Sequence, residues 1–165
     1  MAAVKKRRQR RQRSPSMIEL IKNRDFTAGL SGWHTGGAMI LPAEGDSAGN
    51  SVLLFRPHAF ISRTVRVSPG DRLYYTIACR AQFPAANSPF ILRLRWVKAS
   101  GNFAGLALEH YFPPGSIGSE PVLLQGFLRT APRQATWLDI RGDAPMADNG
   151  SGLIIDLISL KKMRH

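Results

Sequence analysis

The chain has little of several features that usually fix a fold or an activity. Cys79 is its one cysteine, which excludes an intrachain disulfide framework. No run of 18 apolar residues occurs, so we expect no membrane-spanning helix. The basic start is not followed by an apolar stretch of sufficient length, so we expect no secretory signal. No window of ten or more residues has convincing helical periodicity, which argues against a helical domain.

Residue patterns typical of catalysis are also missing. The four histidines, His34, His58, His110 and His165, are scattered and lack metal-binding spacing. No glycine-rich phosphate loop or nucleophile elbow is present, and no pair of acids lies in a local frame that indicates glycoside hydrolysis. Cys79 shares the parity of apolar neighbours in its segment, which predicts a buried small side chain. We therefore expect a protein that is not an enzyme and has no cofactor.

Charge is abundant but unevenly placed. The net charge is +12, and residues 1–13 contain seven basic residues and no acid. Three more basic residues lie in the last five positions: Lys161, Lys162 and Arg164. The thirteen basic residues that remain nearly balance the eleven acids, so the high pI belongs to the two ends. The seven basic residues near the start are Lys5, Lys6, Arg7, Arg8, Arg10, Arg11 and Arg13.

This composition divides the chain into three parts. Residues 1–16 form a basic arm, which like-charge repulsion and the lack of apolar residues should leave flexible. Residues 17–160 have the composition of one folded domain, and residues 161–165 form a short basic tail.

Short apolar runs separated by turn residues fill the domain. Several runs alternate with period two; in one of them Phe90, Leu92 and Leu94 share one face. Eight to ten short strands at this spacing predict an all-β fold, a two-sheet antiparallel β-sandwich of the jelly-roll kind. The predicted strands are 18–21, 38–41, 51–55, 59–67, 72–81, 90–98, 106–112, 122–130, 136–141 and 153–160.

Three segments, in order, resemble a known family. Residues 20–33 (LIKNRDFTAGLSGW) resemble the N-x-x-F-E-x-G-L-x-G-W start of carbohydrate-binding-module-like, or galactose-binding-like, jelly rolls. Residues 64–74 (TVRVSPGDRLY) and 152–160 (GLIIDLISL) are similar to a middle segment and the closing strand of that family. The layout also resembles small surface proteins of spore-forming bacteria, including NTTM-type domains, and some phage structural proteins. The resemblance implies the fold strongly and a ligand weakly.

In this family the acid after the phenylalanine and the aspartate of the last strand help to hold a structural calcium. Here Thr27 replaces that acid, which leaves Asp156 with few carboxylate partners. Calcium prefers six to eight oxygen ligands with several carboxylates. We therefore expect no calcium and predict that Asp156 is a hydrogen-bonding strand residue, with a metal role only as a weak candidate.

Exposed aromatic rings are candidate sugar-binding groups, because sugars stack on their apolar faces. We select Tyr74, Tyr111 and Trp137, whereas Trp33 and Trp96 are expected in the core. Strand parity also places Arg93 and Arg95 outward, where they form a candidate contact face for a neighbouring copy or an anionic ligand.

Three functions are compatible with these features. The leading hypothesis is a structural surface protein that assembles with copies of itself and uses the basic arm as a tether. The alternatives are a glycan-binding module and a capsid-like protein whose arginine-rich arm binds nucleic acid. Without a secretory signal, we expect a cell surface, spore surface or virion reached by non-classical assembly, or otherwise the cytoplasm.

Overall fold

The computed structural model describes residues 16–44, 49–83, 87–148 and 150–164, and every regular element within them is a β-strand. The eleven strands are β1 (Met17–Glu19), β2 (His34–Gly36), β3 (Ala38–Leu41), β4 (Ser51–Leu54), β5 (Ala59–Arg66), β6 (Leu73–Ala81), β7 (Phe90–Val97), β8 (Phe103–Phe112), β9 (Val122–Phe127), β10 (Trp137–Ala144) and β11 (Leu153–Met163). The predicted basic arm lies almost wholly outside the described residues.

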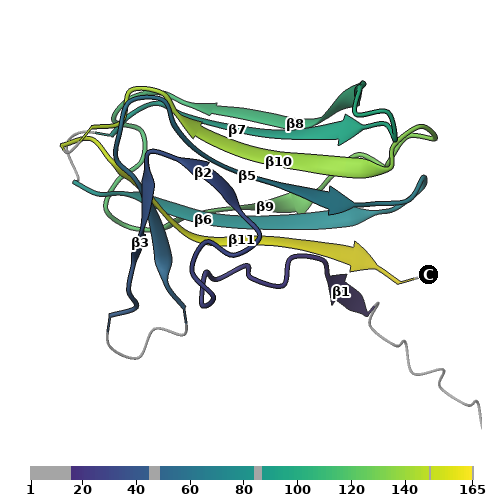
Figure 1. Ribbon diagram of the computed structural model, residues 1–165, viewed down its shortest axis with the longest axis horizontal. Helices are drawn as coiled ribbons and strands as arrows, with labels where there is room; N and C mark the ends of the chain where they lie inside the picture. Colours follow the sequence, from purple (N-terminus) through teal and green to yellow (C-terminus); the bar gives the residue numbers. More distant parts are fainter. Residues whose placement is uncertain (1–15, 45–48, 84–86, 149, 165) are drawn as a thin grey trace, which may run out of the picture.

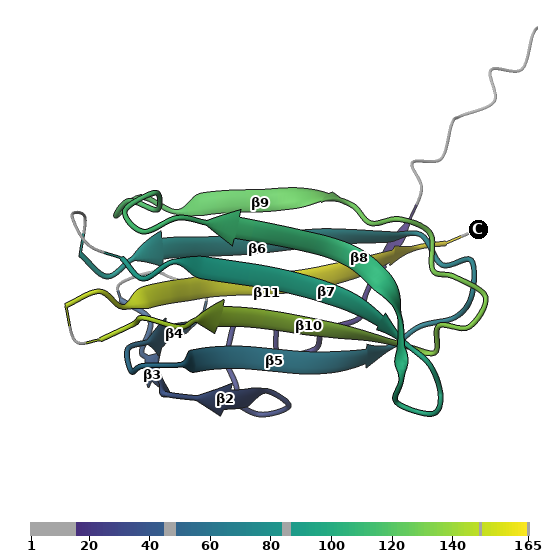
Figure 2. The ribbon, with the colours of Figure 1, turned by 90° about the horizontal axis from the view of Figure 1, so that it is seen from above.

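The strands form two antiparallel sheets packed face to face (Figures 1 and 2). One sheet has the order β3-β4-β11-β6-β9, and β1 pairs with the end of β11. The other has the order β2-β5-β10-β7-β8, and Figure 2 looks onto its outer face. Apart from the consecutive pairs β3–β4 and β7–β8, neighbours in the two strand orders come from distant parts of the chain, as a jelly roll requires. The predicted all-β sandwich is confirmed.

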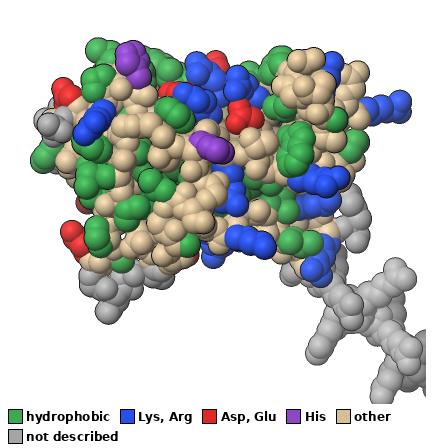
Figure 3. Space-filling view, in the orientation of Figure 1, with side chains coloured by type: hydrophobic (Ala, Val, Ile, Leu, Met, Phe, Trp, Pro, Cys, Tyr) green, Lys and Arg blue, Asp and Glu red, His purple; other side chains and the backbone are tan. Residues whose placement is uncertain are grey.

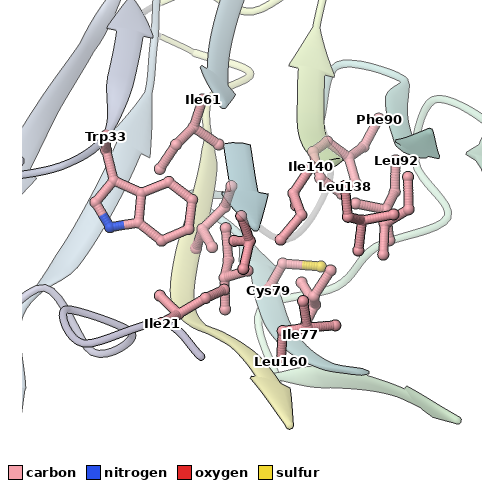
Figure 4. Packing of buried hydrophobic residues seen from close by; sticks show 14 of the residues in the cluster. Ile21, Trp33, Ile61, Ile77, Cys79, Phe90, Leu92, Leu138, Ile140 and Leu160 are labelled. Carbon is pink, nitrogen blue, oxygen red and sulfur yellow. The ribbon is translucent and has the colours of Figure 1, made fainter. Parts of the chain in front are cut away.

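Alternation along the strands builds the core between the sheets. In β7 every second side chain is buried, from Phe90 to Trp96, and the intervening residues face outward. The inward residues of the central strands of both sheets meet in one apolar cluster (Figure 4). Gly142 is part of this packing, because an added Cβ would lie 2.9 Å from the ring of Phe90. The inner layer therefore tolerates little change in volume.

The segment between β1 and β2 is held by one buried asparagine. The side-chain amide of Asn23 donates to the carbonyls of Gly29 (2.8 Å) and Ser31 (3.1 Å), and its oxygen accepts from the Ala28 N–H (3.0 Å). The backbone carbonyl of Asn23 accepts from Trp33 Nε1 at 2.9 Å. Trp33 is buried, as predicted, and it extends the core under this segment.

Several strand ends differ from the predicted ranges, and two of the differences change the composition of the sheets. Strand β2 was not predicted, because three residues ending in glycine carry no alternating apolar pattern. Strand β11 continues to Met163, so the predicted tail begins inside the sheet rather than after residue 160. Lys161 and Lys162 extend the strand because their backbones pair with β6 and β1 while their side chains reach solvent.

Candidate ligand-binding face

The outer face of the five-stranded sheet is the candidate site. Antiparallel register aligns its outward side chains in cross-strand rows. From the end of the sandwich that carries β1 to the opposite end, the rows are Arg66–Trp137–Val97–Phe103; Thr64–Asp139–Arg95–Leu106; His34–Ser62–Arg141–Arg93–Glu109; and Gly36–Phe60–Asp143–Ile91–Tyr111. Aromatic side chains lie in the outer rows, and charged side chains fill the middle.

Arginines and acids interlock in the middle of this face. Arg93 Nε donates to Glu109 Oε2 at 2.8 Å, and its Nη1 lies 3.5 Å from Asp143 Oδ2. Arg141 donates to the same Asp143 at 2.8 Å. Each guanidinium is therefore fixed in orientation by a carboxylate of a neighbouring strand or of its own.

The next row contains a tighter pair. Arg95 donates to Asp139 Oδ2 through both Nε (3.2 Å) and Nη2 (2.5 Å). Arg93 and Arg95 face outward, as strand parity indicated, but acids of this same chain neutralise them. Their use as a contact face stays a prediction, although a neighbour's acids are not needed to balance their charge.

Two of the three selected aromatics share this face. Trp137 lies at one end, with the guanidinium of Arg66 6.0 Å above its ring. Tyr111 lies at the other end, and 58% of its surface is exposed. Six residues of β10 separate the two rows, which corresponds to roughly 20 Å along the strand. The sheet therefore presents aromatic rings on both sides of a charged centre.

A hollow of about 310 Å³ lies at the Tyr111 end of the face. Its floor includes Ile91 and the paired side chains of Arg141 and Asp143. Beside it, the Arg141 guanidinium lies 4.2 Å from the centre of the Phe60 ring. The hollow therefore combines apolar surface with hydrogen-bonding groups whose positions are fixed. It is lined by His58, Ala59, Ile91, Arg93, Arg141, Asp143 and Pro145.

The third aromatic, Tyr74, belongs to the other sheet. It projects from β6, and its ring meets Phe127 of β9 edge to face with the centroids 5.0 Å apart. Strand parity predicts inward or outward orientation, but it does not reveal which sheet a strand joins. Tyr74 thus belongs to a surface opposite Tyr111 and Trp137.

Asp156 behaves as a hydrogen-bonding strand residue. It stands at a bulge of β11, where its carboxylate accepts from Ser51 Oγ (2.6 Å) and lies 3.3 Å from Arg80 Nε. Thr27, at the position of the family's acid, donates instead to Asp25. Because the Asp156 carboxylate already forms an ion pair with Arg80, these residues do not fit a calcium site. Within the described residues, no three His, Cys, Asp or Glu side chains gather as metal ligands.

Cys79 lies in the core between the sheets (Figure 4). Burial, with a smaller contribution from Asp156, raises the pKa of its thiol to about 12. A thiol in this environment is protonated at neutral pH, so Cys79 is a packing residue rather than a nucleophile.

Comparison with known proteins supports the fold. No protein-family model and no curated protein matches the chain by sequence. Among solved structures, the enzymatically active domain of tailspike protein 4 of bacteriophage CBA120 has a TM-score of 0.70 at 14% identity, and the match covers 88% of this chain. That match spans only 21% of the tailspike chain. The CBM22-1 xylan-binding domain of Paenibacillus barcinonensis Xyn10C has a TM-score of 0.65 at 12% identity over 93% of this chain and 99% of its own.

A third structure belongs to the same class. TmCBM61, solved in complex with β-1,4-galactotriose, has a TM-score of 0.58 at 13% identity over 87% of this chain. At these identities the likeness shows the fold, which is a carbohydrate-binding-module-like jelly roll. Within the described residues, no helix is long and apolar enough to cross a membrane.

Proposed function

We propose that this protein is a non-catalytic glycan-binding module whose site is the outer face of the five-stranded sheet. One observation carries the proposal: Tyr111 and Trp137 flank a centre of fixed, planar, charged side chains on one sheet. Sugar rings stack on such aromatic faces, and sugar hydroxyls both donate and accept hydrogen bonds. The spacing of the two rings suits an extended chain of several sugars better than a single residue.

The ion pairs favour binding because they prepare the site before a ligand arrives. Asp143 holds two guanidiniums, and Asp139 holds a third through two hydrogen bonds. These side chains lose little further rotamer freedom when a sugar hydroxyl joins them. The remaining lone pairs of the carboxylates and free N–H groups of the arginines stay available to the ligand.

The same pairs speak against catalysis on this face. Glycoside hydrolysis needs one carboxylic acid that donates a proton and a second carboxylate across the scissile bond. All three carboxylates in the rows, Glu109, Asp139 and Asp143, are paired with arginines, so no two free carboxylates face each other across this surface. Among the similar structures, one is described as xylan-binding and another holds β-1,4-galactotriose, so neutral β-linked polysaccharides are the first ligands to test.

The test is retention of the full-length protein by immobilised xylan and galactan, followed by calorimetric titration with their oligosaccharides. Y111A and W137A should each weaken binding about tenfold, as expected for the loss of one stacking ring. Y74A is the matched control, because it removes an aromatic ring from the opposite sheet. Losses for Tyr111 and Trp137 with Y74A unchanged support the proposal.

Two results contradict it. One is the absence of retention on a broad panel of neutral and acidic polysaccharides. The other is binding that survives both five-stranded-sheet variants and fails in Y74A, which would move the site to the other face.

Self-assembly, with the basic arm as tether, stays a prediction, and so does a surface or virion location of the NTTM or phage type. The proposal of a glycan site does not depend on either.

A further inference from the structure

Basic residues gather at one end of the sandwich. The segments 66–73, 97–103, 127–137 and 160–164 together contain eight basic residues and one acid, a net charge of +7. Figure 3 shows Lys and Arg side chains gathered at the right of the view, where β1 and the C-terminal strand lie in Figure 1. The basic residues are Arg66, Arg72, Lys98, Arg129, Arg133, Lys161, Lys162 and Arg164.

Backbone hydrogen bonds tie these segments into one surface. The Met163 N–H donates to the Arg72 carbonyl (3.1 Å), and the Leu128 N–H donates to that of Leu73 (2.9 Å). The Thr136 N–H donates to the Val97 carbonyl at 2.9 Å. The single acid of these four segments, Asp71, is buried and pairs with Lys162 at 2.7 Å. Strand β1 adds a second acid, Glu19, opposite Lys161, which leaves a net charge of +6 at this end.

The other end of the sandwich differs in sign. Its loops, 55–59, 82–90, 112–122 and 144–153, contain one basic residue, Arg56, and two acids, Glu120 and Asp148. The domain is nearly neutral as a whole, but its charge is segregated along the strand direction. The net charge of the whole domain does not reveal this segregation, because the basic residues at one end come from four distant segments.

Aromatic rings accompany the basic residues on the outer face of the six-stranded sheet. Register aligns Lys161, Tyr74 and Phe127 in one cross-strand row of β11, β6 and β9. Phe127 is 54% exposed, and the guanidinium of Arg72 lies 5.8 Å from the centre of its ring. Together with the exposed Arg129, these side chains form what we term the basic aromatic patch: Arg72, Tyr74, Phe127, Arg129 and Lys161.

The arm joins the fold beside this patch. The Ser16 carbonyl accepts from the Arg164 N–H at 3.0 Å, and β1 pairs with the last residues of β11. Seven basic residues lie between positions 5 and 13, shortly before Ser16 in the sequence. The chain therefore enters the fold, at Ser16, at its basic end.

A second copy of this chain lacks the acids to balance that charge. The chain has eleven acids, and six of them are in ion pairs with its own basic residues. At most five are left for the seven basic residues of the arm and the net +6 of the folded end. A polyanion with regularly spaced charges would balance the positive charge of this end. Exposed aromatic rings beside cations favour a polyanion that also carries flat π-systems. Single-stranded nucleic acid has both, whereas acidic polysaccharides lack flat π-systems.

We infer that the basic aromatic patch is a binding site for single-stranded nucleic acid. Bases stack on Phe127 and Tyr74, and phosphates contact Arg72, Arg129 and Lys161. The site lies on the sheet opposite the glycan-binding face and does not depend on it.

The test is fluorescence anisotropy of full-length protein with labelled oligo(dT) over a series of salt concentrations. F127A should bind at least about fivefold more weakly, the lower limit for losing one stacked base. L123A is the matched control: Leu123 is on the same strand and face and is also 54% exposed. R72Q combined with K161Q should reduce the slope of log K against log salt concentration by about 0.7 for each phosphate contact that is lost. R56Q is its control, because Arg56 also lies over a phenylalanine ring but at the opposite end.

Heparin and double-stranded DNA serve as competitors. The inference holds if F127A weakens oligo(dT) binding, leaves heparin binding unchanged, and L123A and R56Q behave as wild type. It is overturned if oligo(dT) does not bind, if F127A and L123A bind alike, or if R72Q/K161Q keeps the wild-type salt dependence. Equal binding of heparin and oligo(dT) in every variant would also overturn it, because charge alone would then explain the affinity. Retention on xylan, measured in parallel, reports on the other face separately.

Discussion

Replacing Asn23 by alanine tests how the N-terminal segment is fastened to the sandwich. Asn23 is 7% exposed, and its side chain makes three hydrogen bonds to the backbone between Ala28 and Ser31. Only the side-chain amides of asparagine and glutamine offer two donor hydrogens and one acceptor oxygen. The glutamine side chain is one methylene too long to make the same three bonds. N23A should therefore release the segment that carries Phe26 and positions Trp33.

The expected cost follows from the bonds that are lost. Three side-chain hydrogen bonds contribute about 1 kcal/mol each, and buried groups left without partners add to this. We expect N23A to lower the free energy of unfolding by about 2–4 kcal/mol. For a chain of this size that is a drop in melting temperature of roughly 6–12 °C.

Urea and thermal unfolding followed by tryptophan fluorescence measure this effect. N102A is the control, because Asn102 is an exposed residue of the connection between β7 and β8. N23D should destabilise the fold at least as much as N23A at neutral pH, since its second carboxylate oxygen would face the carbonyl oxygens of Gly29 and Ser31. A change below about 0.5 kcal/mol in N23A would refute the reasoning, because it would mean that water replaces the asparagine without cost.

Two further predictions concern charged and reactive groups. Because burial raises the pKa of Cys79 to about 12, a thiol reagent should leave the folded protein unmodified at pH 8 and react fully in urea; rapid reaction of the native state would contradict the buried position. R93E/R95E places new carboxylates beside Glu109, Asp139 and Asp143, so it should lower the melting temperature of the domain itself, whatever its state of assembly. An unchanged melting temperature in that variant would show that the observed ion pairs contribute nothing to stability.

Much of the fold is readable from local sequence. The alternation of Phe90, Leu92, Leu94 and Trp96 fixed both the strand and its inner face, and ten of the predicted strand segments correspond to observed strands. Strand β2 was not predicted, because a short edge strand ending in Gly36 is defined by its partner β5 rather than by its own side chains.

The candidate sites needed the three-dimensional structure. Local pattern places Tyr74, Tyr111 and Trp137 outward or at strand ends, but only the register assigns them to opposite sheets. The acids that pair with Arg93 and Arg95 come from other strands, so sequence alone did not show that this chain supplies them. The basic end is likewise invisible in the chain, since its members are up to about a hundred positions apart.

The hydrogen bond between Ser16 and Arg164 also sets how this domain connects to anything outside it. Chain entering at residue 16 and chain leaving at residue 164 pass through the same corner of the molecule (Figure 1). A domain with adjacent ends can be inserted into a surface loop of another protein with short linkers at both junctions. Tension applied through the two ends would peel β1 from β11 one bond at a time instead of shearing the sandwich. Either fused or tethered at this corner, the module would keep the far end of its five-stranded sheet, with Tyr111, pointing away from its support.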